Sequence, residues 1–137
     1  MKDKDCIFCL LAGGDIPTAK VYEDDRLTAI LDAGPAAKGH VIIIPKDHYK
    51  NITEVPEDLS AAMISLASRI GQAQMKQLGA GGFNILVNTN EVAGQTVFHV
   101  HMHVIPRYEG EPMIVTWIPG KSEEPEKTAE LIAKGLD

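Results

Sequence analysis

The chain has 137 residues and a mass of 14.8 kDa, so we expect one domain spanning residues 1–137. Hydrophobic residues make up 45% and charged residues 23%, which is typical of a globular protein and excludes a disordered one. With 13 basic and 19 acidic residues, the net charge of −6 argues against binding a nucleic acid polymer through a broad basic surface. A small phosphate ligand remains possible, because backbone N–H groups and histidines can hold it.

The N-terminal region indicates a cytoplasmic protein. No run of 18 apolar residues is present, so we expect no membrane-spanning segment. The short apolar stretch near the start is interrupted by Cys6 and Cys9 and does not resemble a signal peptide. In the cytoplasm both thiols stay reduced, and a Cys-x-x-Cys pair then indicates a metal site, redox chemistry or coincidence.

The first third of the sequence is predicted to form β-strands. Val21–Tyr22 and Leu27–Asp32 read as a strand pair around a charged turn, and the second strand alternates between two faces. A loop rich in glycine, proline and alanine (Ala33–Gly39) leads to Val41–Ile44. This β-branched apolar run is typical of a central strand that is covered on both faces.

The rest of the sequence is predicted to form a long helix, further strands and a C-terminal helix. The helix begins at Pro56, carries an apolar stripe at helical spacing from Leu59 to Leu78, and ends at a cluster of glycines. The elements expected after it are strands Phe83–Asn88 and Val97–Ile105, a short strand Met113–Ile118 and a helix Ser122–Leu136. Strands joined by turns, with one long helix against one face, predict an α+β fold with an antiparallel sheet.

Three histidines alternate along the strand expected at Val97–Ile105. On a strand, His99, His101 and His103 would share one face, about 7 Å apart. The residues beside them are predicted to face the core: Phe98, Val100, Met102 and Val104. One neutral imidazole can act as a nucleophile while a neighbour protonates a leaving group. A zinc triad and a merely solvated strand face are the alternatives.

A loop precedes the histidines and could hold a phosphate. Gly94 lets the backbone approach a ligand closely, and the Thr96 hydroxyl and Val97 amide could donate hydrogen bonds to phosphate oxygens. An ordinary loop that enters a strand would show the same residues. Its position next to the histidines favours the phosphate site.

The sequence resembles the histidine triad (HIT) family of nucleotide hydrolases and transferases, whose motif is His-x-His-x-His with apolar residues at each x. The matching segments are CIFC, YEDDRLTAILD, GHVIIIPKDH, Asn88 and AGQTVFHVHMHVIPR. The likeness is greatest to bacterial zinc-containing members of the nucleoside phosphoramidase-like branch. It implies a HIT-like, five-stranded antiparallel sheet that continues across a homodimer.

The resemblance also implies a reaction. His101 would attack the α-phosphorus of a nucleoside phosphoramidate or related nucleotide conjugate and form a nucleotidyl-histidine intermediate, from which water releases a nucleoside monophosphate. His103 would contact the phosphate or leaving group, and His40 would complete the catalytic cluster. Asp32 would bind the ribose hydroxyls, because a carboxylate accepts two hydroxyl hydrogen bonds. For a purine nucleotide, the implied base slot is Ile7, Phe8, Ile30, Leu31 and Ile42, and the implied phosphate shell is Asn88, Gln95, Thr96 and Val97.

Family members with these cysteines bind a structural zinc ion, and the resemblance implies that Cys6, Cys9, His48 and His99 are its ligands. Trp117 lies in the C-terminal segment that completes the partner's pocket in related proteins. Three other functions stay open at this point. They are dinucleoside polyphosphate hydrolysis, a non-catalytic nucleotide-binding role in regulation, and a redox or metal-handling role for the cysteines.

Overall fold

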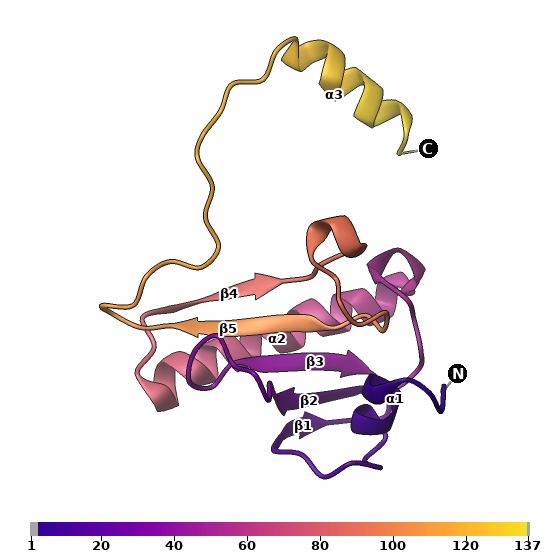
Figure 1. The fold of residues 1–137 in the computed structure, drawn as a ribbon, viewed down its shortest axis with the longest axis vertical. Coiled ribbons are helices and arrows are strands. Elements are labelled where there is room, and N and C mark those ends of the chain that lie inside the picture. The colour runs from indigo at the N-terminus through magenta and orange to yellow at the C-terminus, as the bar shows by residue number, and fades with distance from the viewer. Residues whose placement is uncertain (1–2, 137) are drawn as a thin grey trace.

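The computed structural model of the protein describes residues 3–136 and has the expected α+β architecture (Figure 1). Two short 3-10 helices, Ile52–Glu54 and Glu91–Ala93, flank its long helix and the strand that follows. The main elements in chain order are α1 (Ile7–Ala12), β1 (Lys20–Glu23), β2 (Leu27–Leu31), β3 (Val41–Pro45), α2 (Glu57–Leu78), β4 (Gly82–Leu86), β5 (Met102–Arg107) and α3 (Pro125–Lys134).

The five strands form one antiparallel sheet in the order β1-β2-β3-β5-β4. β3 lies in the middle and is buried along its whole length, as its β-branched sequence predicts. In the register between β3 and β5, Ile42 lies opposite His103. This pairing places the start of β3, where His40 lies, beside the histidine-bearing strand.

The two faces of the sheet carry separate apolar clusters. Leu27 and Ala29 of β2 face α2 and belong to the larger cluster, whereas Ile30 faces α1 and belongs to the smaller one. The alternation expected for this strand is therefore confirmed. Thr28 also faces α1, and its buried hydroxyl donates to the carbonyl of Ala12 at 2.9 Å, which ties α1 to the sheet.

The long helix α2 begins and ends where the sequence predicts. Pro56 precedes its first turn, Glu57 and Asp58 lie near the positive end of the helix dipole, and Gly79 ends it with φ of 75°. At Gly71 the helix approaches the sheet so closely that an added Cβ atom would lie 2.4 Å from the Phe83 ring. A glycine at this position lets the ring pack directly on the helix backbone.

We expect Gly71→Ala to lower the free energy of unfolding by about 1–2 kcal/mol. Overpacking in a core costs about 1–3 kcal/mol, and the better helix propensity of alanine returns up to about 1 kcal/mol. Chemical denaturation measures the change, with Ser65→Ala on the exposed face of α2 as the control. The same substitution in a Phe83→Leu background should cost less, because the clashing ring is gone. An equal cost in both backgrounds would show that the ring contact is not responsible.

The predicted limits of one strand were wrong, and one predicted strand is absent from the described residues. The strand expected at Val97–Ile105 begins only at Met102, because the preceding residues bend and the amide of Val100 donates to the carbonyl of Tyr49 instead of to a strand. It also continues through Pro106 to Arg107 instead of ending at the proline. The short strand expected at Met113–Ile118 is absent from the described structure, where these residues have no regular form.

Two further features differ from the sequence analysis. The short helix α1 was not expected, because its apolar residues are too few to show a helical period. Phe98 was expected in the core but is 43% exposed, since it precedes the regular part of β5, and the Nζ atom of Lys50 lies 5.9 Å from the centre of its ring. Val100, Met102 and Val104 are buried as expected.

The C-terminal segment extends away from the sheet. After β5 the chain runs outward past the edge formed by β4 and ends in α3, which stands clear of the body of the molecule (Figure 1). Residues 116–136 are all exposed. The apolar side chains of this segment therefore lack the burial that stabilises such residues elsewhere in the chain.

Candidate functional site

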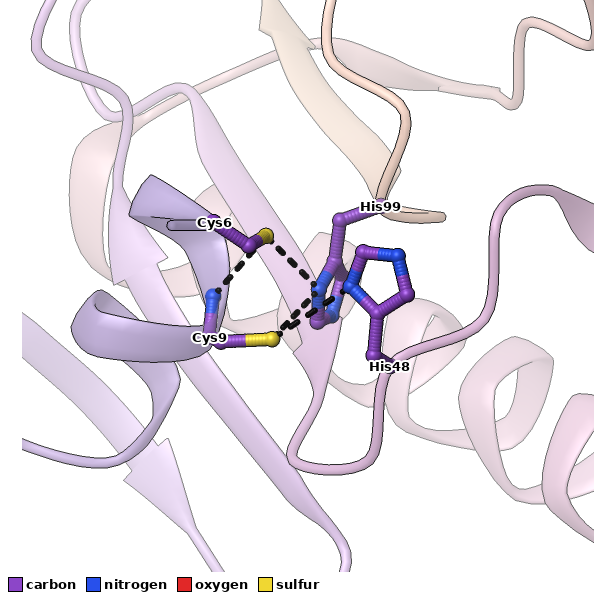
Figure 2. Close-up of side chains that lie close together, drawn as sticks. All are labelled: Cys6, Cys9, His48 and His99. Carbon is purple, nitrogen blue, oxygen red and sulfur yellow. Dashed lines mark hydrogen bonds between the residues drawn. The ribbon is translucent and has the colours of Figure 1, made fainter. Parts of the chain in front are cut away.

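Two clusters of histidines lie on the α1 side of the sheet, and the first also contains both cysteines (Figure 2). Cys6 precedes α1 and Cys9 lies within it, while His48 and His99 come from the segments that follow β3 and precede β5. His99 Nδ1 lies 3.3 Å from the sulfurs of both Cys6 and Cys9, and His48 Nδ1 lies 3.4 Å from Cys9 Sγ. The four ligand atoms all lie within 4.8 Å of one another.

Hydrogen bonds around this cluster orient its donors. His99 is fully buried, and its Nε2 N–H donates to the carbonyl of Pro45 at 2.8 Å, so its Nδ1 lone pair faces the cysteines. The amides of Asp3 and Cys9 donate to the sulfurs of Cys9 and Cys6, at 3.3 Å each. Burial raises the pKa of the Cys9 thiol and lowers the pKa of His99 to about 4. His99 is therefore neutral at pH 7, as a metal ligand must be.

The geometry fits a tetrahedral ion. With metal–sulfur distances of about 2.3 Å and metal–nitrogen distances of about 2.0–2.1 Å, tetrahedral zinc holds its sulfur and nitrogen ligands about 3.6 Å apart. The separations of 3.3–3.4 Å between sulfur and nitrogen here are close to that value. Two thiols and two imidazoles also form one of the common donor sets of structural zinc.

The second cluster borders a cavity of about 670 Å³ between α1, the ends of β2 and β3, and the loop before β5. His101 and His103 lie in its wall, together with Asp32. The rest of the lining is mostly apolar, with a few polar groups: Ile7, Phe8, Leu11, Ile16, Pro17, Thr18, Ile30, Leu31, Ala33, Ile42, Asn88, Gly94, Thr96 and Val97. Apolar walls with a few convergent polar groups are typical of small-molecule sites.

His101 is held as a neutral imidazole in one orientation. Its Nδ1 N–H donates to the backbone carbonyl of His99 at 2.8 Å, which leaves the lone pair on Nε2. The Phe8 ring packs edge-on against it, with centroids 4.7 Å apart. Burial lowers the pKa of His101, although the hydrogen bond to the His99 carbonyl and the charge of Asp32 both act in the opposite direction.

His40 and His103 form a hydrogen-bonded pair whose proton positions follow from the backbone. The amide of Ala36 donates to His40 Nδ1 at 3.0 Å, so a neutral His40 carries its proton on Nε2. That N–H donates to His103 Nδ1 at 2.9 Å, and a neutral His103 therefore carries its own proton on Nε2. Burial lowers the pKa of His103 to about 4, with smaller effects from His101 and His40. The pair thus gives the site an N–H donor next to the His101 ring, whose centroid lies 5.0 Å from that of His103.

Asp32 lies at the end of β2, beside this pair. Its Oδ1 accepts from the amide of Gly34 at 2.8 Å, and its Oδ2 lies 3.5 Å from His40 Nε2. Burial lowers the pKa of His40, and the carboxylate of Asp32 partly offsets the effect. The carboxylate also borders the cavity, where it can accept further hydrogen bonds.

Asn88, Gly94, Thr96 and Val97 also line the cavity. Gly94 has φ of 100°, a conformation that favours glycine, and it lets the loop pass close to the Asn88 side chain. Gln95 has a different role in the structure. Its side chain is buried and bonds to the backbone of Asn90, Lys50 and Val97, so it holds the loop and does not line the cavity.

The structure thus brings together nearly all the residues singled out from the sequence. His40 is buried behind the cavity and reaches it through His103, and Leu31 lies where the cavity meets the opposite face of the sheet. Sequence reasoning missed part of the wall, namely Leu11, Ile16, Pro17, Thr18 and Ala33. The apolar character of the segment around α1 was the available signal for the first four.

Fold and site together define a small α+β protein with a histidine-lined cavity beside a Cys2His2 cluster. The HIT domain model matches residues 13–110. The protein SMU.412c of Streptococcus mutans is 37% identical, and its crystal structure matches with a TM-score of 0.92 over 99% of this chain and 88% of that one. The chain therefore belongs to the HIT domain family. The alignment covers 99% of this chain and therefore includes the C-terminal segment.

Two other similar proteins bear on the site. A Zn-bound histidine triad family protein from Mycobacterium smegmatis is 36% identical, with a TM-score of 0.77 over 96% of this chain and 93% of that one. The adenylylsulfatase HINT3 of Arabidopsis thaliana is 47% identical over 77% of this chain and 53% of its own length. No helix within residues 3–136 is long and apolar enough to cross a membrane.

Proposed function

We propose that the protein is a nucleotide hydrolase that cleaves at the α-phosphate of nucleoside phosphoramidates or related nucleotide conjugates. The proposal rests on the position and the protonation of the His101 ring. It lies in the cavity wall with Nδ1 bonded to the His99 carbonyl, so the Nε2 lone pair is the nucleophile. Non-catalytic nucleotide binding would not require an imidazole held in this way.

In the proposed reaction His101 Nε2 attacks the α-phosphorus, a phosphorus–nitrogen bond to His101 forms, and the bond to the leaving group breaks. The His103 N–H donates a hydrogen bond to the phosphoryl oxygen or the leaving atom, the leaving amine takes up a proton from the solvent, and the Val97 amide, the Thr96 hydroxyl and Asn88 stabilise the developing charge. Water then attacks the same phosphorus, the phosphorus–nitrogen bond to His101 breaks as the phosphorus–oxygen bond forms, and the proton of the water passes to the solvent as a nucleoside monophosphate is released. The apolar part of the cavity receives the base, and Asp32 accepts hydrogen bonds from the ribose hydroxyls.

The charge of the cavity favours a leaving group with little negative charge. Among the described residues that line it, none is a lysine or an arginine, and Asp32 adds a negative charge. An amine or a single anionic group suits such a site better than the polyphosphate chain of a dinucleoside polyphosphate, whose charges would face no permanent cation. The likeness to HINT3 makes adenylyl sulfate a second candidate substrate.

We further propose that the Cys2His2 cluster binds one zinc ion, and that the ion is structural. Bound there, the ion would link the N-terminal segment to the two segments that carry His48 and His99. All four ligands would come from the protein, which leaves no open position for substrate. The Zn-bound relative supports this assignment.

The protein is also proposed to form a homodimer through β4. This strand is at one edge of the sheet and, among the described residues, pairs with β5 alone, so its outer backbone groups are available to a second copy. Antiparallel pairing of two β4 strands would continue the sheet across a two-fold axis.

A substrate panel tests the proposed activity. Adenosine 5′-phosphoramidate, adenylyl sulfate and diadenosine polyphosphates are each incubated with the protein, and released AMP is measured. We expect fastest release from the phosphoramidate, together with an AMP adduct on the peptide that contains His101 after a rapid alkaline quench. An adduct on His103 would contradict the assigned nucleophile. AMP binding without hydrolysis of any substrate would instead identify a regulatory nucleotide-binding protein.

A further inference from the structure

The C-terminal helix α3 packs against no other element within residues 3–136. It has only ten residues, and helices shorter than about 12–15 residues are marginal in water unless they pack against something. One side carries an apolar stripe formed by Ala129, Ile132 and Ala133, and Leu136 lies just beyond the C-terminal end of the helix. Ile132 is 65% exposed and Leu136 is 82% exposed. Such a helix needs a surface on which to bury this stripe.

An apolar groove of about 370 Å³ lies on the sheet face that is opposite the histidines. It exists because α2 packs mainly on β3, β4 and β5, so that Val21 of β1 and Leu31 at the end of β2 stay exposed on this face. Val21, Leu31 and Leu78 are exposed in it, at 41–47% of their surface. The lining comprises Val21, Tyr22, Leu31, Gly39, Val41, Leu66, Arg69, Ile70, Ala73, Gln74, Gln77 and Leu78.

Charge and shape match the groove to α3. The Arg69 side chain lies over the Tyr22 ring, 5.6 Å from its centroid, and places a positive charge on the groove wall. Glu126 and Glu130 lie one turn apart beside the apolar stripe of α3. A helix seated with its stripe in the groove can therefore bring an acidic edge toward Arg69.

The direction of the chain favours a groove on a second copy. The C-terminal segment leaves the body past the β4 edge, while the groove lies beside β1, at the other edge of the sheet (Figure 1). A second copy that continues the sheet through β4 stands on the side toward which the segment extends. The alignment with the S. mutans structure, at a TM-score of 0.92, includes this segment.

We propose that α3 of each protomer docks in the α2–β1–β2 groove of the other, so that the dimer exchanges its C-terminal helices. The inference rests on the homodimer proposed above. Each protomer gives one helix and receives one, as a two-fold interface requires. The groove also borders Gly39 and Leu31, which adjoin His40 and Asp32 in the chain, so the docked helix would brace the strand ends that carry these two side chains.

Photo-crosslinking in trans tests the docking. A tagged full-length copy with benzoylphenylalanine in place of Ile132 is mixed and refolded with an untagged copy that ends at Gly120 and has no α3. Size-exclusion chromatography with light scattering gives the oligomeric state independently. We expect a covalent product of the two different chains, with the crosslink on peptides from residues 66–78 or 20–31 of the short copy. Crosslinks within one chain, or to the Ile16–Thr18 side of the molecule, would overturn the proposal even if the protein is dimeric. A monomeric mass would instead refute the dimer itself.

Hydrogen exchange of α3 gives a second readout that does not depend on crosslinking. Ala73→Asp places a charge on the groove wall and should reduce the protection of the α3 amides at least tenfold, while the protein stays dimeric through β4. Gln72→Asp, on the outward side of α2 and outside the groove, should change protection less than twofold. Ile132→Asp and Lys127→Asp are the corresponding test variant and control on α3. Ile132 lies on the apolar stripe, so its substitution should reduce the protection of the α3 amides, whereas Lys127 lies off the stripe and its substitution should not. Equal protection in all four variants would refute docking in this groove.

Discussion

His101→Ala should lower kcat/KM for adenosine 5′-phosphoramidate by a factor on the order of 10⁴ or more. The substitution removes the only imidazole of the cavity whose Nδ1 donates to a backbone carbonyl among the described residues, and with it the Nε2 lone pair that attacks phosphorus. The base slot, Asp32 and the phosphate-binding loop remain. Binding of AMP should therefore change less than about tenfold, because binding does not need the nucleophile.

Two measurements keep this prediction interpretable. Phe98→Ala alters another residue of the triad segment, but Phe98 lies outside the cavity lining, so this variant should keep activity within about threefold of wild type. Circular dichroism and metal content of His101→Ala should match wild type, since its ring is not part of the Cys2His2 cluster. Turnover at the wild-type rate by a folded His101→Ala protein would disprove the assignment of the nucleophile.

Cys9→Ala should abolish stoichiometric zinc binding and lower the melting temperature by roughly 10 °C or more. Cys9 is 1% exposed, and its sulfur is close to both histidines of the cluster. Structural zinc contributes on the order of 10 kcal/mol to folding in small zinc domains. Loss of even about 3 kcal/mol of that stabilisation gives a shift of this size in a chain of this length. Metal analysis after purification without added metal, and calorimetry, measure the two effects.

The zinc variant should also affect catalysis, because one residue connects the two clusters. The His99 ring belongs to the metal cluster, while the His99 carbonyl accepts the Nδ1 proton of His101. Without the metal the ring keeps only its hydrogen bond to the Pro45 carbonyl, so the His99 carbonyl is held less firmly and His101 can exchange tautomers. We expect lower kcat with KM little changed, together with a shift of the His101 nitrogen signals in ¹⁵N NMR spectra.

A second ligand variant serves as the control for this coupling. His48→Asn removes a ligand that comes from outside α1, so it separates metal loss from local damage at α1. It should reproduce both the loss of zinc and the NMR shift. If Cys9→Ala kept one zinc per chain, the assignment of Cys9 as a ligand would be wrong. If it lost zinc with an unchanged His101 signal, the coupling through His99 would be wrong.

Much of the fold follows from local pattern. The alternation in β2 assigns its two faces, because successive strand side chains point to opposite sides. The apolar stripe of α2 gives its limits nearly to the residue, since Pro56 and Gly79 mark its ends chemically. The start of β5 could not be predicted from local pattern, because the amide of Val100 donates to the carbonyl of Tyr49, a partner that is distant in sequence.

The sequence by itself determined which chemistry is available: three alternating imidazoles, a cysteine pair and a glycine-containing loop are visible without any structure. Only the tertiary structure decided how these groups divide into two sites. His99 and His101 are two residues apart, yet one ring faces the cysteines and the other borders the cavity. The proton positions on His40 and His103 depend likewise on the Ala36 amide and on the register of β3 with β5. Residue spacing limits what a segment can present, but hydrogen-bond partners that come from elsewhere in the chain fix the orientation of each ring.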